Sequence, residues 1–214
     1  MNQTVLEQIH GGIRRLGLDL SAASEETLGT YLSLLAKWNR TYNLTAVREE
    51  SAMVSQHLLD SLAVLPYLQS NSSAAQSLAD VGSGGGLPGI PLAIAYPQIR
   101  VELIEASHKK ASFLEQVRIE LKLQNVSVHC GRVEAYKPMY RFDVLISRAF
   151  SSLADFVQLA AHLLVPGGRL LAMKGVHPQE EIEHLPPGWC VSQSIPLNVP
   201  ELNAQRGLIV IERA

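Results

Sequence analysis

The chain has 214 residues, of which 47% are hydrophobic and 18% are charged, with a formal net charge of −2 and a mean hydropathy of +0.10. These values are typical of a globular protein and exclude an intrinsically disordered one. No apolar run approaches the roughly 20 residues that span a bilayer, and the N-terminal stretch MNQTVLEQIHGG lacks the features of a signal peptide. We therefore expect a cytoplasmic protein, whose net charge disfavours non-specific coating of nucleic acid but allows a local basic face.

Cysteine and histidine spacings give no sign of a metal centre. Cys130 and Cys190 form no Cys-x-x-Cys pair, and the seven histidines show no His-Glu-x-x-His pattern. We expect both cysteines to be reduced and predict no structural metal.

The first seventy residues carry apolar side chains at helical spacing. Ser24, followed by Glu25 and Glu26, is typical of an N-cap and an acidic first turn. The predicted buried face of this helix comprises Leu28, Tyr31, Leu32, Leu35 and Trp38. A second apolar series consists of Val54, Leu58, Leu62 and Leu65. It predicts a helix that ends at Pro66.

A short polar connection over residues 70–75 divides the chain. We place the boundary there, so that residues 1–70 form an N-terminal helical extension and residues 71–214 form the main domain.

From residue 77 onward, apolar runs of strand length alternate with helical stretches. The predicted strands span residues 78–81, 101–104, 126–129, 142–146 and 169–173. The predicted helices span residues 90–96, 109–123 and 153–164, and Pro166-Gly167-Gly168 ends the last of them. This alternation indicates right-handed βαβ units and a parallel sheet with helices on both faces. Two further runs, 189–195 and 207–212, have no long helix between them and predict a closing hairpin with an antiparallel strand.

The stretch LADVGSGGGLPGI, residues 78–90, contains five glycines. Each ordered glycine costs roughly 0.5–1 kcal/mol relative to alanine, so packing alone does not explain the cluster. Ligands of open α/β sheets bind at the carboxyl ends of the strands, where this turn is expected to lie. A ligand against the backbone is therefore predicted. A phosphate-binding P-loop is excluded, because Ile90 and Pro91 stand where Lys and Ser or Thr are required.

Two cofactor classes fit the remaining pattern. The Gly-x-Gly-x-x-Gly spacing over 84–89, with Glu105 about twenty residues further on, matches a dinucleotide fingerprint. Asp80 would instead place a negative charge near a pyrophosphate and so favours a cationic ligand. S-adenosylmethionine carries an ammonium and a sulfonium. In this interpretation Asp80 attracts the amino group, Gly82 and Gly84 admit the ligand close to the backbone, and Glu105 accepts from the ribose hydroxyls; a nicotinamide cofactor and a purely structural turn remain the alternatives.

Further stretches resemble one protein family. KWNRTYNLTAV (37–47), HLLDSL (57–62) and LISRAFSSL (145–153) accompany DVGSGGGLPGIPLAI and LLVPGGRLLAMKG. Together they resemble the GidB family, also called RsmG, whose members use S-adenosylmethionine to methylate N7 of a guanine in 16S ribosomal RNA. The resemblance covers about residues 25–212. It implies an α/β, Rossmann-like class I methyltransferase fold, with a mostly parallel sheet, helices on both faces, a C-terminal antiparallel strand and N-terminal helices.

The resemblance also implies site residues. Gly82 and Leu87 in the glycine loop, the Val133-Glu134 pair and Arg148 in the SRAF stretch would contact the cofactor or line its pocket. Arg148, after the fourth strand, would also position substrate and cofactor. The candidates for holding the RNA are Lys37, Arg40, Arg148 and Lys174.

No acid–base pair is required for this chemistry, because N7 of guanine holds an in-plane lone pair. His57 and Asp60 lie at i and i+3, but no Gly-x-Ser-x-Gly elbow supplies a nucleophile, and a capping or packing role is favoured for them. A nicotinamide-dependent oxidoreductase and a non-catalytic S-adenosylmethionine-binding module remain competing functions. The expected partner is 16S ribosomal RNA or the 30S subunit, and a monomer is expected because no coiled-coil seam is present.

Overall fold

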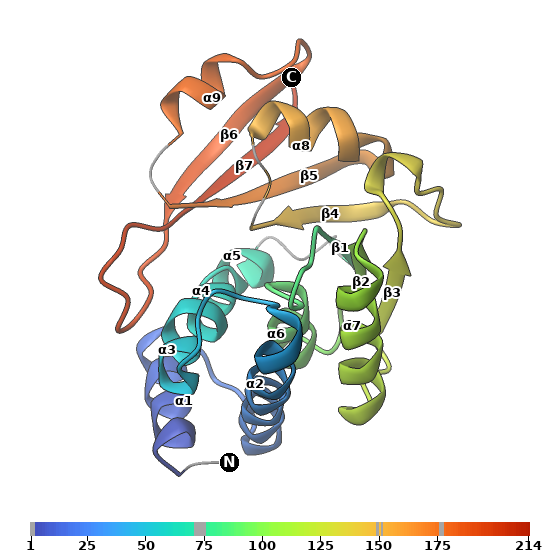
Figure 1. Ribbon diagram of the computed structural model, residues 1–214. Coiled ribbons are helices and arrows are strands. Elements are labelled where there is room, and N and C mark those ends of the chain that lie inside the picture. Colours follow the sequence, from blue (N-terminus) through green and yellow to red (C-terminus); the bar gives the residue numbers. More distant parts are fainter. Residues whose placement is uncertain (1–2, 71–75, 149, 151, 176–177) are drawn as a thin grey trace.

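A computed structural model describes residues 3–70, 76–148, 150, 152–175 and 178–214 (Figure 1). Most of the connection in which we placed the domain boundary lies outside these residues. In the described part of the chain, no helix combines the length and the apolar character needed to cross a membrane.

The N-terminal part is a layer of helices. These are α1 (Gln3–Arg15), α2 (Ala22–Tyr42), α3 (Glu50–Met53), the π-helical turn η1 (Val54–Leu59), α4 (Asp60–Leu62) and α5 (Leu65–Ser70). The predicted N-cap at Ser24 is wrong: the cap of α2 is Ser21, whose Oγ accepts from the Ser24 N–H at 3.1 Å. The three-residue spacing is that of a capping side chain, so Ser24 already lies inside the first turn.

The second predicted helix is interrupted. The apolar series from Val54 to Leu65 crosses the π-helical turn, and Pro66 does not end it, because Pro66 is the second residue of α5. Proline is well tolerated in a first helical turn, where its missing N–H would have no partner within the helix. Pro66 therefore belongs to the start of a helix and not to the end of one.

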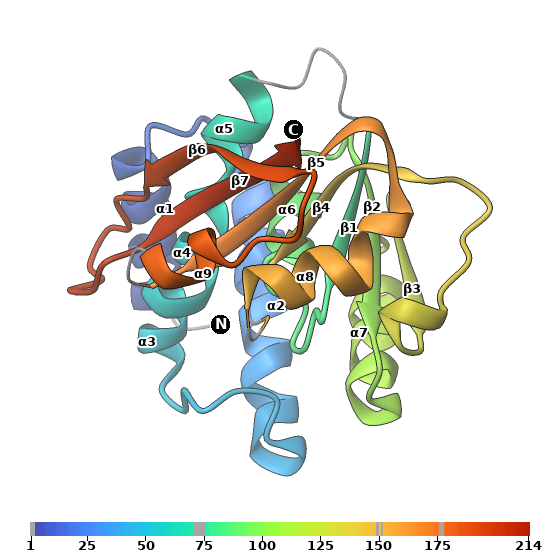
Figure 2. The same cartoon turned by 90° about the horizontal axis from the view of Figure 1, so that it is seen from above.

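In the described part of the chain, seven strands form one sheet in the order β3-β2-β1-β4-β5-β7-β6 (Figure 2). The strands are β1 (Ser77–Val81), β2 (Arg100–Glu105), β3 (Val126–Cys130), β4 (Phe142–Ser147), β5 (Leu164–Lys174), β6 (Trp189–Pro196) and β7 (Gly207–Arg213). The first five are mutually parallel, whereas β7 runs antiparallel to both β5 and β6. This arrangement confirms the predicted fold class and the closing hairpin.

The connections after the strands are α6 (Gly89–Ala95), α7 (His108–Glu120), the 3-10 turn η2 (Val133–Ala135), α8 (Leu153–Ala160), the 3-10 turn η3 (Ala161–Leu163) and α9 (Gln179–Glu183). The helix predicted over 153–164 ends earlier, and β5 begins five residues before its predicted start at Arg169. The reason is that Leu164 already pairs with Phe142 of β4, ahead of an irregularity in the register. The segment Pro166-Gly167-Gly168 therefore lies within β5.

Two hydrophobic clusters cover the two faces of the sheet. Side chains alternate along β1, so that Leu78 belongs to one cluster and Ala79 and Val81 to the other. The first cluster includes side chains of the N-terminal helices together with those of α6 and α7, and the second packs against α8. Figure 1 shows the sheet between the N-terminal helices on one side and α8 with α9 on the other. The N-terminal helices are thus part of the layer that covers the sheet.

Candidate functional site

The glycine loop follows β1 at the carboxyl edge of the parallel strands. Gly82, Gly84 and Gly86 have φ angles of 74°, 58° and 89°. These left-handed conformations disfavour side chains, which explains glycine at each of the three positions. The loop is tied to the neighbouring strand, because the N–H groups of Gly82 and Ser83 both donate to the Ile104 carbonyl, at 2.9 and 3.2 Å.

The glycines of the loop serve two different purposes. A Cβ at Gly86 would lie 2.6 Å from the Ile90 side chain, and a Cβ at Gly89 would lie 2.4 Å from that of Leu103, so these two glycines permit close packing. A Cβ at Gly82 would meet no described atom within 4 Å, and one at Gly84 would meet only the Gly82 carbonyl at 3.9 Å. Open space therefore lies beside the backbone at Gly82 and Gly84, where a ligand can approach.

Asp80 lies beneath the loop and is completely buried. Its Oδ2 accepts from the N–H of Gly89, the first residue of α6, at 2.9 Å, whereas its Oδ1 has no partner among the described residues. Burial raises the pKa of Asp80 to about 7, although the Gly89 N–H and the nearby Arg148 guanidinium act in the opposite direction. A buried carboxylate with one unpaired oxygen is costly, and a cationic group placed beside it would lower that cost.

Glu105, the last residue of β2, connects the ends of two elements. Its Oε2 accepts from the Gly84 N–H and its Oε1 from the Ser107 N–H, each at 2.8 Å. Each carboxylate oxygen has a second lone pair that can accept from a ligand hydroxyl. The side chain thus holds the glycine loop in place and retains acceptor capacity next to the open space.

The other residues predicted to line the cofactor pocket differ in exposure. Leu87 and Val133 are buried, at 4% and 8% exposure, and Glu134 is exposed. Val133 and Glu134 form the 3-10 turn that follows β3, whose last residue pairs with Glu105. They therefore lie beyond the carboxyl end of the strand next to β2, with an apolar side chain and a carboxylate side by side.

Arg148 follows β4 and faces the N-terminal helices. Its guanidinium is 3.3 Å from the Gln56 carbonyl and 3.4 Å from Asp60 Oδ2, and the other carboxylate oxygen of Asp60 accepts from Arg206 Nε at 3.0 Å. Asp60 is 2% exposed, and burial raises its pKa against the opposing charges of the two arginines. The single buried carboxylate of Asp60 therefore joins the guanidinium groups of Arg148, just after β4, and Arg206, in the β6–β7 connection.

His57 lies one helical turn before Asp60. Its Nε2 is 2.7 Å from Thr45 Oγ1 in the NLTAV stretch, and its Nδ1 has no partner in the described chain. Burial, followed by the charge of Arg148, lowers the pKa of His57 to about 4, so the imidazole is neutral at pH 7. His57 and Asp60 thus have different partners, and the capping or packing role favoured for them from the sequence stays a prediction.

A cavity of about 340 Å³ opens beside this cluster. Its lining consists of Gln56, His57, Asp60, Arg148, Met173, Lys174, Gly175 and Arg206. Three of these side chains are cationic, and they come from the residue after β4, from the end of β5 and from the β6–β7 connection. The cavity is a suitable place for a polyanionic substrate to meet the carboxyl edge of the sheet.

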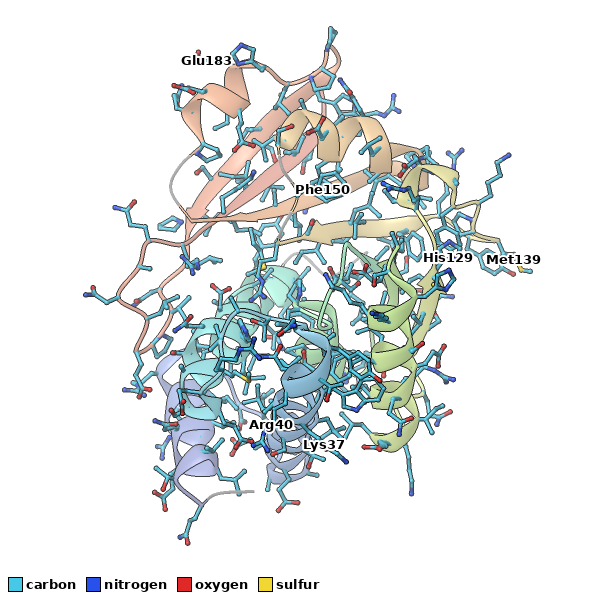
Figure 3. The ribbon with its side chains drawn as sticks, viewed as in Figure 1. Lys37, Arg40, His129, Met139, Phe150 and Glu183 are labelled. Carbon is cyan, nitrogen blue, oxygen red and sulfur yellow. The ribbon has the colours of Figure 1, made fainter. Side chains whose placement is uncertain are left out.

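The candidate RNA contacts do not gather at one place. Lys174 lines the cavity but pairs with Glu181 of α9, its Nζ lying 2.8 and 3.1 Å from the two carboxylate oxygens. Lys37 and Arg40 are exposed on α2 (Figure 3). They are separated in sequence and in the fold from Lys174, which lies at the end of β5.

Sequence reasoning missed two contributors to the site. The Tyr31 hydroxyl, on α2, donates to the Gly85 carbonyl at 2.6 Å and so attaches the N-terminal layer to the glycine loop. Arg206 completes the pairing of Asp60. Tyr31 was visible only as a member of an apolar helical face, and no motif marks Arg206, because its role depends on a contact 146 residues away in the chain.

The fold is shared with solved methyltransferase structures. These include a mitomycin 7-O-methyltransferase (TM-score 0.62, 19% identity, covering 98% of this chain and 67% of that one) and the methyltransferase TrmN of Thermus thermophilus (TM-score 0.56, 17% identity, covering 75% and 53%). The O-methyltransferase TomG of Streptomyces achromogenes, solved with S-adenosylmethionine, has a TM-score of 0.57 at 18% identity, covering 86% of this chain and 89% of that one. The sheet order and the glycine loop accordingly define a Rossmann-like class I methyltransferase fold.

Sequence comparison narrows this class to one family. The sequence model of the rRNA small subunit methyltransferase G family, GidB, matches residues 24–210. Proteins named ribosomal RNA small subunit methyltransferase G are 54% identical in Aromatoleum aromaticum, with 100% of both chains covered, and 54% identical in Laribacter hongkongensis, with 95% and 96% covered. The chain belongs to this family, which confirms the family predicted from the sequence motifs.

Proposed function

We propose that the protein transfers the methyl group of S-adenosylmethionine to N7 of a guanine in 16S ribosomal RNA. Family membership and the class I methyltransferase fold support a methyltransferase acting on small-subunit ribosomal RNA. The choice of N7 follows from the family resemblance. The site agrees with it, because its lining offers cations and one imidazole, His57, whose pKa is lowered to about 4 and which is therefore a weak base.

The observation that carries the cofactor assignment is the arrangement of Asp80 under the glycine loop. In a dinucleotide fold, free N–H groups at the first helix bind the pyrophosphate. Here the Gly89 N–H is already bonded to Asp80, and the Ile90 N–H donates to the Gly86 carbonyl at 2.8 Å. A diphosphate would meet a carboxylate and no free donors at these two residues. An ammonium would meet the unpaired Oδ1 of Asp80, directly or through water, which favours S-adenosylmethionine over a nicotinamide cofactor.

The surrounding residues fit the other parts of that ligand. Gly82 and Gly84 leave open space beside the backbone, and Glu105 offers acceptor lone pairs to ribose hydroxyls. Val133 supplies an apolar surface for the adenine and Glu134 an acceptor for its amino group. When bound, the cofactor supplies an electrophilic methyl group on its sulfonium.

The residues around the cavity would position the guanine. N7 attacks with an in-plane lone pair, so no proton has to be removed first, and the neutral His57, bonded to Thr45, is not needed as a base. Alignment of well-oriented reactants can contribute about 7–11 kcal/mol to catalysis. We assign this alignment to Arg148. Its charge acts on the pKa of Asp80, and its side chain lines the cavity, so it lies between the proposed cofactor and substrate sites.

The RNA would enter over the cationic lining of the cavity. N7 faces the deep, narrow major groove of an RNA helix, so the target guanine has to lie in a loop or be turned out of its stack. Arg206 and Lys174 join Arg148 as phosphate partners. Lys174 would leave Glu181 to bind the phosphate, and the Glu181 carboxylate would then be hydrated by solvent. Lys37 and Arg40 remain candidates for more distant contacts of the same RNA, and we propose that the enzyme acts as a monomer.

The test uses labelled S-adenosylmethionine with 30S subunits and with bare 16S ribosomal RNA, followed by mapping of strand scission at 7-methylguanine. We expect a single labelled guanine, and calorimetry should give a cofactor affinity near micromolar, or about −8 kcal/mol. Incorporation into neither substrate, or binding of a nicotinamide cofactor in place of S-adenosylmethionine, would contradict the proposal.

Arg148→Ala should abolish methyl transfer while the cooperative unfolding transition persists. Arg118→Ala, which removes a half-buried guanidinium that pairs with Glu115 on α7, is the control and should keep full activity. Unchanged turnover in Arg148→Ala would show that alignment does not depend on this residue.

A further inference from the structure

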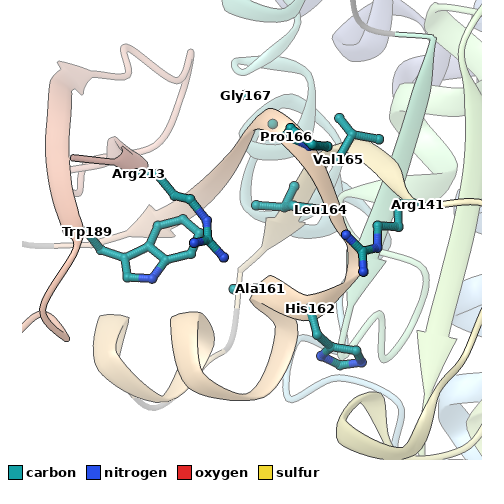
Figure 4. Close-up of a pocket in the computed structure, with 10 residues that line it drawn as sticks. Arg141, Ala161, His162, Leu164, Val165, Pro166, Gly167, Trp189 and Arg213 are labelled. Carbon is teal, nitrogen blue, oxygen red and sulfur yellow. The ribbon is translucent and has the colours of Figure 1, made fainter.

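A second cavity lies at the opposite edge of the sheet. It has a volume of about 360 Å³, and its lining comprises Arg141, Ala161, His162, Leu164, Val165, Pro166, Gly167, Gly168, Trp189 and Arg213 (Figure 4). Arg141 precedes β4 and Arg213 ends the antiparallel β7, so the cavity lies at the amino ends of the parallel strands. Along β4 this is roughly 20 Å from Arg148, at about 3.3 Å per residue. This cavity is therefore separate from the cavity beside Arg148, with which it shares no lining residue.

The lining of this cavity is cationic and uncompensated. It includes two arginines and one histidine but no Asp or Glu, in a chain whose formal net charge is −2. Arg141 has no hydrogen-bond or ion-pair partner among the described residues, and the guanidinium carbon of Arg213 lies 5.1 Å from the centroid of the Trp189 ring. The neighbouring Glu212 pairs with Arg169 instead. Two guanidinium groups therefore line one cavity whose wall contains no carboxylate, which is a favourable environment for an anion.

The remaining lining fixes the positions of Arg213 and His162. Trp189 and Arg213 are directly paired across β6 and β7, so the cation–π contact holds the guanidinium at the cavity wall (Figure 4). The His162 Nε2–H donates to the Tyr136 carbonyl at 3.1 Å, which anchors the imidazole at the opposite wall. Leu164 and Pro166 provide an apolar floor. A phosphate with its attached sugar matches both the charge and the size of this cavity.

The loop that leads to Arg141 adds a surface for bases. It reads YKPMYR over residues 136–141, and Met139 and Tyr140 are 86% and 69% exposed. Figure 3 shows Met139 directed away from the body of the molecule. Isolated exposed apolar residues need no explanation. In this loop, however, the exposed ring of Tyr140 lies in the sequence between two cations, Lys137 and the unpaired Arg141. Exposed aromatic rings interleaved with cations are the pattern on which unpaired RNA bases stack.

We propose that the cavity and the 136–141 loop form a second RNA-binding surface, which takes a phosphodiester between Arg141 and Arg213 and stacks an unpaired base on Tyr140. This inference rests on the proposed function, because the RNA is a segment of the small-subunit ribosomal RNA other than the target loop. The distance from Arg148 is too long for the reacting nucleotide to occupy both places. The surface therefore contributes to substrate affinity and not to chemistry.

The test is the double variant Arg141→Gln/Arg213→Gln, compared with Arg14→Gln/Lys122→Gln, which removes the same charge from exposed positions elsewhere. With unmethylated 30S subunits, we expect the first variant to raise KM at least tenfold with unchanged kcat. The slope of log Kd against log salt should fall by about 1–2, since each phosphate contact contributes about 0.7–0.9. Tyr140→Ala should raise KM without changing this slope, because stacking releases no counterion.

Further measurements keep the inference separate from the proposed function. Calorimetry with S-adenosylmethionine and turnover of a short hairpin carrying only the target loop should be unchanged in the double variant. A wild-type protein that methylates no RNA would overturn the proposed function, whereas equal KM and salt slopes in the variant and its control would overturn the second surface. Tight binding of adenosine 5′-monophosphate that is lost in the double variant, with subunit affinity unaffected, would replace the RNA by a free nucleotide.

Discussion

Gly82 and Gly17 have nearly the same left-handed backbone conformation but lie in different surroundings. Gly82 and Gly17 have φ angles of 74° and 71°, and a Cβ at either position would meet no described atom within 4 Å. Gly17 lies in a surface turn after α1, whereas Gly82 lies at the carboxyl edge of the sheet beside Asp80. The open space at Gly82 is therefore a feature of the proposed cofactor site, and the space at Gly17 is solvent.

Gly82→Ala should abolish cofactor binding at a modest cost in stability. An alanine at positive φ costs about 1–2 kcal/mol, and its methyl group would project into the space that the cofactor needs. Gly17→Ala carries the same backbone strain without the obstruction and is the matched control. Urea unfolding should show similar losses for both variants, whereas calorimetry with S-adenosylmethionine should fail only for Gly82→Ala. Similar cofactor affinities in the two variants would place the cofactor elsewhere.

Asp80 illustrates a conflict between function and stability. Its pKa in the folded chain is about 7, against an ordinary value of 3.8, so folding favours the protonated form. The contribution of this group to stability is complete below about pH 4 and is lost as the pH rises from there to about 7. Glu105 and Arg148 are the charged neighbours that modulate this value.

Asp80→Asn should stabilise the protein, and the gain should be larger at pH 8 than at pH 5. The amide oxygen can still accept from the Gly89 N–H, and no charge has to be buried. We expect a gain of at least about 1 kcal/mol at pH 8, since each unit of pKa shift corresponds to about 1.4 kcal/mol. Urea unfolding at the two pH values measures it. The same variant should bind S-adenosylmethionine more weakly.

The exposed Asp19, replaced by Asn in the same way, serves as the control and should change unfolding little at either pH. A loss of stability in Asp80→Asn at pH 8 would mean that the ionised carboxylate is well compensated in the folded protein.

Among the elements, α2 does more than cover the sheet. Leu28, Leu32 and Leu35 are fully buried in the first hydrophobic cluster, and Trp38 contacts Phe113 of α7 with ring centroids 5.4 Å apart. The Tyr31 hydroxyl bonds to the Gly85 carbonyl of the glycine loop. The helix therefore determines where the middle of the loop lies.

Tyr31→Phe should destabilise the protein by about 1–3 kcal/mol, because it leaves the buried Gly85 carbonyl without a partner. It should also weaken cofactor binding, since the loop loses a fixed point. Thermal unfolding and calorimetry measure the two effects. Tyr42→Phe removes a hydroxyl from a ring that is 44% exposed on the same helix and should change neither quantity. Tyr31→Phe with unaltered cofactor affinity would show that the loop is held by its other contacts.

Periodicity predicted most of these elements but not all of their ends. The strands β1 to β4 differ from their predicted bounds by at most one residue at either end. The start of β5 was missed because Leu164 pairs with Phe142 across the sheet, a contact that no local pattern contains. The π-helical turn η1 was missed for a different reason, because the spacing of Val54, Leu58 and Leu62 is that of a regular helix.

For the molecule as a whole, the N-terminal helices and the sheet share one hydrophobic core. The first cluster joins Leu28 and Leu35 of α2 to Ile90 of α6 and Phe113 of α7, all of them completely buried. Burying each such side chain contributes about 1.5–3 kcal/mol. We propose that residues 1–70 are the outer layer of the sheet and not an independent unit.

A chain consisting of residues 71–214 alone should fail to fold cooperatively, because it exposes the α6 and α7 surfaces that α2 covers. Thermal unfolding of the intact protein should show one transition in which far- and near-ultraviolet circular dichroism coincide. The shortened chain should show no such transition. A cooperative transition in the shortened chain would establish two domains.

The sequence by itself determined the class of fold, the family and the place of the glycine loop, since these depend on local periodicity and on contiguous motifs. Tertiary structure alone decided which side chains meet there. Tyr31 reaches the loop, Arg206 reaches Asp60, and Arg141 and Arg213 converge on a cavity, over separations of 54, 146 and 72 residues. The physical reason is that backbone conformation follows neighbouring residues, whereas charge pairing and cavities arise only where packing brings distant segments together.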